Sequence, residues 1–308
     1  MTDHALPYRP PYDGARLAAF LADHASPGVE TVAGGVYSRT FRFGDRFGTL
    51  RVTPSPDEPA LLVRLRAQGL DDGARDAVLA RLRAMFDLDA DPAAIAAGLG
   101  GDPFMADLVR RRPGLRMPGA FDPFELTVRA ILGQQVSVAA ATRLAGRLVA
   151  AFGTRLPETA AAPGLTHAFP EPAQLVEADV SLVLNMPRAR GRAVRGIAAA
   201  VLDAPAVFAS GPDLEACVAR LTALPGIGPW TAHYVAMRAL AQVDAFPPGD
   251  VGLMRALDSG SGRPSRAGLL ARAEAWRPWR SYAALHLWAE DADRRSATTP
   301  QTHYFSTT

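Results

Sequence analysis

The chain has 308 residues, of which 48% are hydrophobic and 21% charged, and 33 basic against 31 acidic residues give a formal net charge of +2. This length suits two or three domains of a soluble globular protein, and no run of about 18 apolar residues could span a bilayer. The single cysteine, Cys217, excludes a disulfide framework, a four-cysteine zinc site and a four-cysteine iron–sulfur cluster within the chain.

The first quarter of the chain mixes helical and strand patterns. The opening stretch MTDHALPYRPPYDG lacks an apolar signal segment, which predicts a cytoplasmic, nucleoid-associated location. A helix is predicted from about residue 14 to 24. The stretch GVYSRTFRFGDRFGTLRVTP alternates apolar and polar residues around a turn, PALLVRLRAQ adds another strand, and DGARDAVLARLRAMFDL has helical spacing. Residues 1–88 are therefore predicted to form an α+β domain with an antiparallel sheet.

Helical periodicity dominates from residue 89 onward. Two amphipathic helices are predicted in DPFELTVRAILGQQVS and VAAATRLAGRLVAAF. A Pro- and Ala-rich connector follows at about 154–172. Further helices are predicted at 173–184, 188–202, 212–223, 265–275 and 280–290. The polar tail, 291–308, has no pattern and is predicted to be flexible.

Arginine supplies every basic side chain, because the sequence contains no lysine. Two segments concentrate arginine without acidic residues, VRRRPGLRMPG at 109–119 and PRARGRAVRG at 187–196. Guanidinium groups match phosphate oxygens, so each cluster could contact a nucleic acid backbone. Each cluster alone is more typical of a solvated helix face.

A glycine-rich hairpin, LPGIG, separates two helical segments near residue 225. Gly226 and Gly228 permit a tight turn, and Pro229 suits the first position of the second helix. Such a hairpin points peptide N–H groups outward and can bind a phosphate. A plain helix–helix turn fits the pentapeptide equally well.

Two aromatic residues and a carboxylate follow the hairpin. Trp230 and Tyr234 are four residues apart and share a helix face, which by itself is more typical of a core pair. Asp250 follows the break FPPG and begins DVGLMRAL, where a carboxylate can cap a helix by accepting backbone N–H bonds.

The segment LPGIGPWTAHYVAMRAL followed by DAFPPGD resembles the signature of the helix-hairpin-helix DNA glycosylase superfamily, and within it the 3-methyladenine DNA glycosylase II family. Similar family segments recur in order over residues 8–290, among them VETVAGGVYSR, RAILGQQVSVAAA and RPWRSYAALHLW. The resemblance implies a TATA-binding-protein-like antiparallel domain followed by an all-α core of two helical domains. The expected domains are 1–88, then 89–122 together with 243–290, then 123–242, then the tail.

The resemblance also implies functional residues, which are carried over by motif. Asp250 would be the catalytic carboxylate. The damaged base would bind Trp230, Tyr234, Trp288 and Phe20. DNA would contact Gly226, Ile227 and Gly228 of the hairpin and Gln134 and Gln135 of a loop that fills the gap left by the extruded nucleotide. A Na⁺ or K⁺ ion would bind the backbone carbonyls of Thr222, Leu224 and Ile227, and no other cofactor is expected. Gln135, Val251 and Pro229 depart from residues frequent in the family.

The implied activity is hydrolysis of the N-glycosidic bond of alkylated bases such as 3-methyladenine in double-stranded DNA, by a monomer, in base excision repair. A cationic base is a good leaving group, so one carboxylate suffices to stabilise the oxocarbenium ion and orient water. Two alternatives stay open. A bifunctional glycosylase–lyase would need a lysine where Trp230 stands, and a noncatalytic hairpin module would have no use for Asp250.

Overall fold

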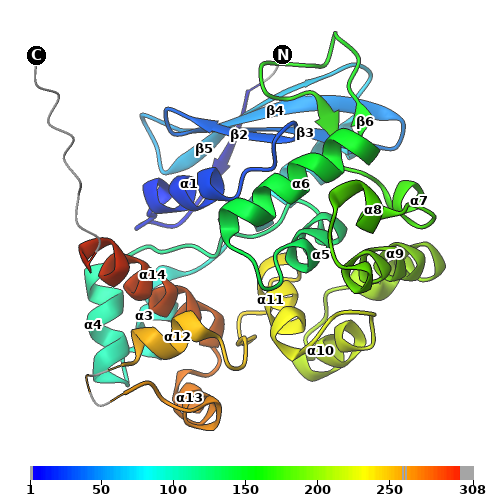
Figure 1. Ribbon diagram of the computed structural model, residues 1–308. Coiled ribbons are helices and arrows are strands. Elements are labelled where there is room, and N and C mark those ends of the chain that lie inside the picture. The colour runs from blue at the N-terminus through cyan, green and yellow to red at the C-terminus, as the bar shows by residue number, and fades with distance from the viewer. Residues whose placement is uncertain (1–2, 259, 261, 299–308) are drawn as a thin grey trace, which may run out of the picture.

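The computed structural model describes residues 3–258, 260 and 262–298 (Figure 1). A β-sheet with α1 and α2 forms one part of the molecule, and helices form the remainder. The sheet precedes the helical core in the chain, so the predicted α+β domain followed by an all-α core is confirmed. No helix among the described residues is long and apolar enough to cross a membrane.

The sheet has five antiparallel strands in the order β1-β5-β4-β3-β2. Their bounds are β1 (Asp3–Pro7), β2 (Glu30–Ala33), β3 (Val36–Phe43), β4 (Arg46–Pro54) and β5 (Ala60–Ala67). The predicted strands β3, β4 and β5 are present, whereas the short outer strands β1 and β2 were not predicted. Two helices, α1 (Gly14–Asp23) and α2 (Asp72–Met85), contribute Leu17, Leu21, Val78 and Leu82 to the same buried cluster as the sheet.

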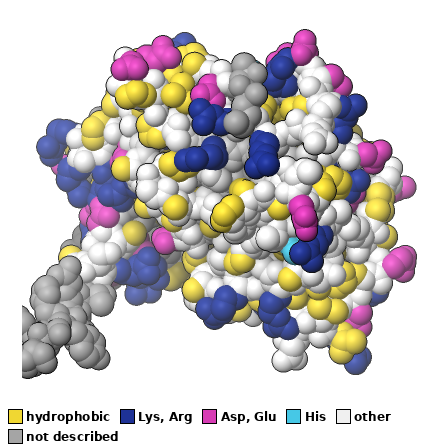
Figure 2. All heavy atoms as spheres, turned by 90° about the horizontal axis from the view of Figure 1, so that it is seen from above, with side chains coloured by type: hydrophobic (Ala, Val, Ile, Leu, Met, Phe, Trp, Pro, Cys, Tyr) yellow, Lys and Arg dark blue, Asp and Glu magenta, His cyan; other side chains and the backbone are white. Residues whose placement is uncertain are grey.

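Charges of both signs and hydrophobic side chains are interspersed over the side of the molecule seen from above in Figure 2. The exposed arginines Arg51, Arg64 and Arg66 lie on the central strands, and Arg64 is paired with Asp3. A mixed surface of this kind lacks the single-sign field that attracts a nucleic acid backbone.

Asp-Pro pairs begin three helices of the core. The Asp side chain caps the helix and Pro takes its first position, as at Asp91, Asp102 and Asp122. The helices that follow are α3 (Pro92–Leu99), α4 (Pro103–Arg111) and α5 (Pro123–Leu132), with α6 (Val138–Phe152) next.

The connector and the helices after it differ from the prediction in two places. The connector contains a two-stranded ribbon of β6 (Thr154–Arg155) and β7 (His167–Ala168). The helix predicted at 173–184 is broken into α7 (Pro172–Leu175) and α8 (Val180–Leu184), because Asp179 caps a new helix by accepting a bond from Leu182 N. The predicted helices at 188–202 and 212–223 correspond to α9 (Arg188–Asp203) and α10 (Leu214–Thr222), separated by a 3-10 turn, η1 (Pro205–Phe208).

The last helix continues into the predicted tail. After α11 (Pro229–Ala239), α12 (Val251–Ala256), α13 (Arg266–Ala273) and the turn η2 (Glu274–Trp276), the chain forms α14 (Arg280–Thr298). The prediction that 291–298 is flexible was therefore wrong, because acidic residues of this stretch bind arginines elsewhere: Asp291 pairs with Arg255 at 2.6 Å and Asp293 with Arg16 at 3.1 Å. Residues 299–308 of the predicted tail lie outside the described residues.

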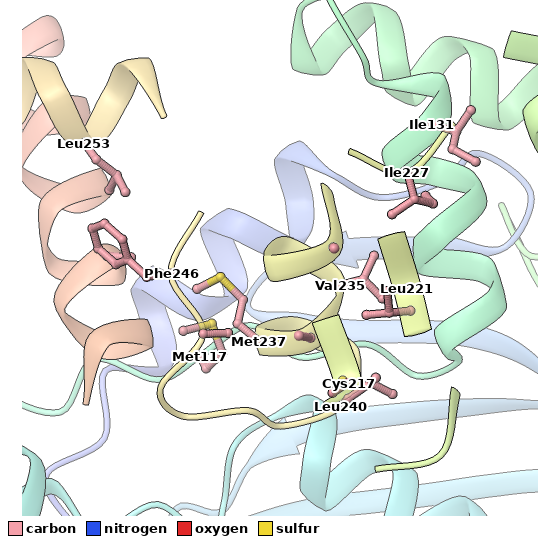
Figure 3. Packing of buried hydrophobic residues seen from close by; sticks show 14 of the residues in the cluster. Met117, Ile131, Cys217, Leu221, Ile227, Val235, Met237, Leu240, Phe246 and Leu253 are labelled. Carbon is pink, nitrogen blue, oxygen red and sulfur yellow. The ribbon is translucent and has the colours of Figure 1, made fainter. Parts of the chain in front are cut away.

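One buried cluster connects the hairpin to the segment before α12. In Figure 3, Ile227 of the hairpin points toward Ile131 of α5, and Phe246 lies near Leu253 of α12. Helices α4 and α12 both pack against α14, while α11 packs against α5 and α10. The proposed domain boundaries within this core stay predictions.

Buried ion pairs fix the sheet to the helical core. Arg39 of β3 contacts Glu125 of α5 at 2.7 Å, and Arg129 of α5 contacts Glu30 of β2 at 2.8 Å. Tyr37 donates to Glu30 at 2.6 Å, and nearby arginines keep the pKa of this carboxyl near 2 although burial opposes them. Removing one partner would leave a buried charge unpaired, so the cluster holds the sheet in place relative to the helical core.

Candidate active site

Asp250 stands at the N-terminus of α12 and caps it. Its Oδ1 accepts a hydrogen bond from Leu253 N at 2.9 Å, and its backbone is extended, with φ −65° and ψ 125°. The helix begins here because Pro247, Pro248 and Gly249 interrupt the preceding chain, and Gly249 adopts a φ of +73°. The capping role predicted for Asp250 is thus present.

Two tryptophans also donate to this carboxylate. Trp230 Nε1 of α11 lies 2.8 Å from Oδ2, and Trp288 Nε1 of α14 lies 3.0 Å from Oδ1. The two indoles come from different sides of the helical core, so Asp250 is held between them. A Cβ built on Gly252 would lie 3.1 Å from Asp250 Oδ1 and 3.3 Å from Trp288, so a side chain there would crowd the carboxylate.

The predicted base-binding aromatics form one cluster beside Asp250. Trp230 and Tyr234 stack with ring centroids 5.0 Å apart and planes 14° apart, and Trp288 meets Tyr234 edge-on at 6.4 Å. All three side chains are half-buried. Because Trp230 and Tyr234 cover one another, a base can pack only on their outward faces in this arrangement. The neighbouring Val251 is 50% exposed.

Phe20 is connected to this cluster by Arg238, a residue that the sequence analysis did not predict to be part of the site. The guanidinium of Arg238 lies 4.7 Å from the centroid of the Phe20 ring and 5.2 Å from that of Tyr234, and Arg238 donates to the Tyr234 hydroxyl. The signal was present in the sequence, because Arg238 follows Tyr234 by four residues within an apolar helix.

The hairpin packs tightly against α9. Gly226 has a φ of +78°, and a Cβ there would lie 2.5 Å from Ala193, whereas Gly228 has a φ of −86° and open space. Ile227 N donates to Leu224 O at 3.2 Å, and Ile227 is buried. Among the described residues no acceptor binds the N–H groups of Gly226 and Gly228, so these two amides are available to an anion.

The loop with Gln134 and Gln135 lies against the hairpin. Gln134 Nε2 donates to Gly226 O at 3.0 Å, and Arg190 of α9 donates to Gln134 O at 2.6 Å. Gln135 is exposed with a φ of +59°. Gln134 therefore attaches the loop to the hairpin, while Gln135 is exposed to solvent.

The carbonyls predicted to hold a monovalent cation lie at the end of α10. The Leu224 carbonyl oxygen accepts a hydrogen bond from Ile227 N. The carbonyl oxygens of Thr222 and Ile227 accept no tertiary hydrogen bond among the described residues. A helix C-terminus carries partial negative charge, so this set of neutral oxygens fits a weakly bound monovalent ion. The described residues contain no cluster of His, Cys, Asp or Glu with metal-binding geometry.

The two arginine clusters have different surroundings. In the first, Arg112 is buried against Glu290 and Asp293, and Arg116 donates to backbone carbonyls, so these two residues are structural. In the second, Arg188, Arg192 and Arg195 are exposed on α9. The hairpin packs against Ala193 of the same helix. The second cluster therefore lies on the helix against which the hairpin packs.

Comparison with known proteins finds two family models on the chain. A model described as the AlkA N-terminal domain matches residues 4–122, and one described as HhH-GPD superfamily base excision DNA repair protein matches residues 128–281.

The chain is also similar to individual proteins. It is 38% identical to DNA-3-methyladenine glycosylase 2 of Escherichia coli K12, over 92% of this chain and 96% of that protein. It is 42% identical to the probable bifunctional transcriptional activator/DNA repair enzyme AlkA of Mycobacterium tuberculosis H37Rv, over 92% of this chain and 56% of that protein, and so spans about half of that relative's length. A solved 3-methyladenine DNA-glycosylase from Archaeoglobus fulgidus has the same fold, with a TM-score of 0.77 and 23% identity, covering 95% of this chain and 98% of that one.

Proposed function

The chain belongs to the HhH-GPD superfamily of base excision DNA repair proteins, and we propose that it is a monofunctional DNA glycosylase that excises alkylated bases such as 3-methyladenine. It hydrolyses the N-glycosidic bond and leaves an abasic site. The observation that carries the proposal is the Asp250 carboxylate, held by two indole N–H groups beside an aromatic cluster.

The target nucleotide must leave the duplex before the bond can be reached. Flipping costs a few kcal/mol and is easiest for a poorly paired, damaged base. The extruded base packs on the outward faces of the aromatic cluster, which attract a cationic base by roughly 0.5–2 kcal/mol per contact. Gln135 fills the space that the base leaves in the stack.

The hydrogen bonds to Asp250 indicate which oxygen acts on the sugar. Oδ1 accepts from Leu253 N and Trp288 Nε1, whereas Oδ2 accepts from Trp230 Nε1 alone among the described residues. A carboxylate oxygen accepts about two hydrogen bonds, so Oδ2 keeps a free lone pair. Oδ2 then stabilises positive charge on the deoxyribose and orients the water that attacks the anomeric carbon.

Backbone contacts hold the DNA without reading its sequence. The amides of Gly226 and Gly228 and the positive end of α11 bind phosphate, and the exposed arginines of α9 extend this contact. A monovalent ion on the carbonyls of Thr222, Leu224 and Ile227 would supply a further positive charge at that phosphate. The partner is double-stranded DNA, bound by a single copy of the chain, and the site of action is the chromosome in the cytoplasm.

Base release from alkylated DNA tests the proposal. The protein is incubated with duplex carrying methylated purines, and free bases are separated and quantified. We expect release by the parent protein and a loss of about 10³-fold in Asp250→Asn, because the substitution removes the charge that stabilises the transition state. Affinity for undamaged duplex should stay within about threefold, since Asp250 is not part of the phosphate contact.

Two results would contradict the proposal. Binding of DNA without release of any base would identify a noncatalytic module. Full activity in Asp250→Asn would mean that another group supports the reaction.

A further inference from the structure

A buried arginine inside α11 borders the proposed base pocket. Arg238 is only 8% exposed and follows Tyr234 by one helical turn. Arginine is rarely buried to this extent unless its charge is paired, so its surroundings call for an explanation.

The Arg238 guanidinium joins three parts of the molecule. Its Nε donates to Pro118 O at 2.5 Å and Nη2 to Gly119 O at 3.4 Å, in the segment that packs on α2. Nη1 donates to the Tyr234 hydroxyl, and the group also lies over the Phe20 ring of α1. All of these partners are neutral.

The positive charge of Arg238 is not balanced by a neighbour. Among the described residues no carboxylate lies within ion-pair distance of it. The same small cavity is lined by three carboxylates, and each of them pairs with another arginine: Glu125 with Arg39, Glu30 with Arg129 and Asp122 with Arg81. The charges of these three ion pairs cancel, so Arg238 adds one positive charge that has no ion-pair partner among the described residues.

The histidine that stacks on Phe20 does not add a further charge. His24 stacks on Phe20 with ring centroids 4.0 Å apart. Burial, with Arg238 second, lowers the pKa of His24 to about 4, so its ring is neutral at pH 7. Arg238 therefore supplies a fixed positive charge on this side of the aromatic cluster.

This charge acts differently on two kinds of leaving base. When the N-glycosidic bond of a neutral purine breaks, the bonding electron pair goes to the base, which leaves as an anion and then takes a proton from water. A cationic alkylated purine accepts the same electron pair and leaves neutral. A fixed positive charge stabilises the first and repels the second on binding. The Arg238 guanidinium also lies over the Tyr234 ring in a cation–π contact. The ring therefore attracts a second cation, such as a cationic base, less strongly.

We propose that Arg238 is a specificity-determining residue that widens the substrate range by favouring neutral damaged purines over cationic ones. The proposal rests on the glycosylase function proposed above. The base would be recognised by the net charge that it carries in the pocket, both on binding and as the bond breaks, and Arg238 would act across the Tyr234 ring without touching the sugar.

The test compares two lesions in one duplex sequence, hypoxanthine as the neutral base and 7-methylguanine as the cationic base. Single-turnover rate constants are measured for the parent, Arg238→Gln and Arg238→Lys with enzyme in excess over DNA but below saturation, so that binding of the base contributes to the rate. The glutamine keeps donors for the carbonyls and removes the charge, whereas the lysine keeps the charge and removes the planar fork. In Arg238→Gln we expect the 7-methylguanine-to-hypoxanthine rate ratio to rise about tenfold, and in Arg238→Lys to stay near the parent value.

Each outcome decides one question. Equal losses for both lesions in Arg238→Gln, at an unchanged ratio, would show that Arg238 only supports the fold and would overturn the proposal. A ratio that changes equally in both variants would assign the effect to geometry and would also overturn it. If Arg238→Gln fails to fold by thermal melting, Arg238→Met is judged by the same ratio. Release of neither base by the parent protein would instead reject the proposed function.

Discussion

The Asp250 carboxylate receives donors from three segments: its own helix, the hairpin helix and the last helix. Their positions are set by the packed core, so the carboxylate is oriented before any substrate binds. Preorganised groups of this kind stabilise a transition state without reorganising during the reaction. The two indoles thus have a role beyond offering an aromatic face.

Replacing one indole separates these two roles. Trp288→Phe keeps an aromatic ring but removes the hydrogen bond from Nε1 to Asp250 Oδ1. Hydrogen bonds to charged groups contribute about 1.5–3 kcal/mol, so we expect the single-turnover rate of base release to fall roughly ten- to a hundredfold. The rate is measured with excess enzyme on a duplex that carries one methylated purine.

Trp279→Phe is the matched control for this substitution. Trp279 packs edge-on against Tyr282, and its indole makes no hydrogen bond among the described residues. Its replacement should leave the rate within about threefold of the parent value. If Trp288→Phe were as active as this control, the indole bond would have no part in orienting Asp250.

The hairpin depends on its two glycines for different reasons. Gly226 needs a positive φ and has no room for a Cβ beside Ala193, whereas Gly228 has neither constraint. Gly226→Ala should therefore lower the free energy of unfolding by about 1–3 kcal/mol and displace the amides that face phosphate. Affinity for damaged and undamaged duplex should fall together, by at least about tenfold, because these contacts carry no base information.

Gly228→Ala provides the comparison in the same turn. Its affinity should stay within about threefold of the parent protein, since its added methyl group meets open space. Both affinities are measured by fluorescence anisotropy with labelled duplexes. A loss confined to damaged duplex in Gly226→Ala would mean that the hairpin contacts the lesion and not the phosphate.

Elements with strong internal periodicity could be predicted from the sequence, and those that depend on distant partners could not. The pattern identifies α1, α2, α9 and α10, as well as the strands β3 to β5. Strand β1 forms only because Ala5 pairs with Leu62 far along the chain, so its five residues carry little local signal. The C-terminal part of α14 was not predicted because it is stabilised by ion pairs with other helices and has no apolar periodicity of its own.

The same distinction applies to the candidate site. Asp250 and Trp230 stand out in the sequence because of a local turn motif. The bonds from the two indoles to Asp250 join residues 20 and 38 positions apart, and a sequence pattern contains no such information. Arg238 was missed because a single arginine in an apolar helix is ordinarily expected to extend its charge to the surface.

Two histidines, the buried His286 and the half-buried His24, make the stability of the whole molecule depend on pH. Burial, followed by nearby arginines, lowers the pKa of both His24 and His286 to about 4. Between pH 6.5 and 4 the unfolded chain therefore binds protons that the folded protein does not, and stability falls as the pH falls. Each histidine adds a slope of up to about 1.4 kcal/mol per pH unit.

Urea unfolding of the parent and of His286→Leu at pH 7, 6 and 5 measures this effect. Nδ1 of His286 has no hydrogen-bond partner in the described structure, so leucine should be tolerated at pH 7. Burial raises the pKa of Asp87 to about 6, which acts in the opposite direction, so the difference between the two proteins is the quantity to follow. We expect the variant to lose less stability on acidification. Parallel pH profiles would show that His286 is protonated in the fold.

The absence of lysine constrains the chemistry available to the whole chain. A β-lyase forms an imine between an enzyme amine and the aldehyde of the abasic deoxyribose, a step that lysine serves. All 33 basic residues of this sequence are arginine, which stays protonated and cannot form the imine. By the family resemblance a lyase would carry its lysine at the position of Trp230, and here the Trp230 indole donates to Asp250.

We therefore expect base release by water alone, with the abasic strand left intact. Duplex carrying a methylated purine is incubated with the protein and borohydride, which reduces any imine to a stable protein–DNA adduct. No adduct should form, and strand breaks should appear only after alkali or an added abasic-site endonuclease. A bifunctional glycosylase on its own substrate serves as the positive control. An adduct that forms at the rate of base release would show that another amine of the chain enters the site and that the enzyme is a lyase.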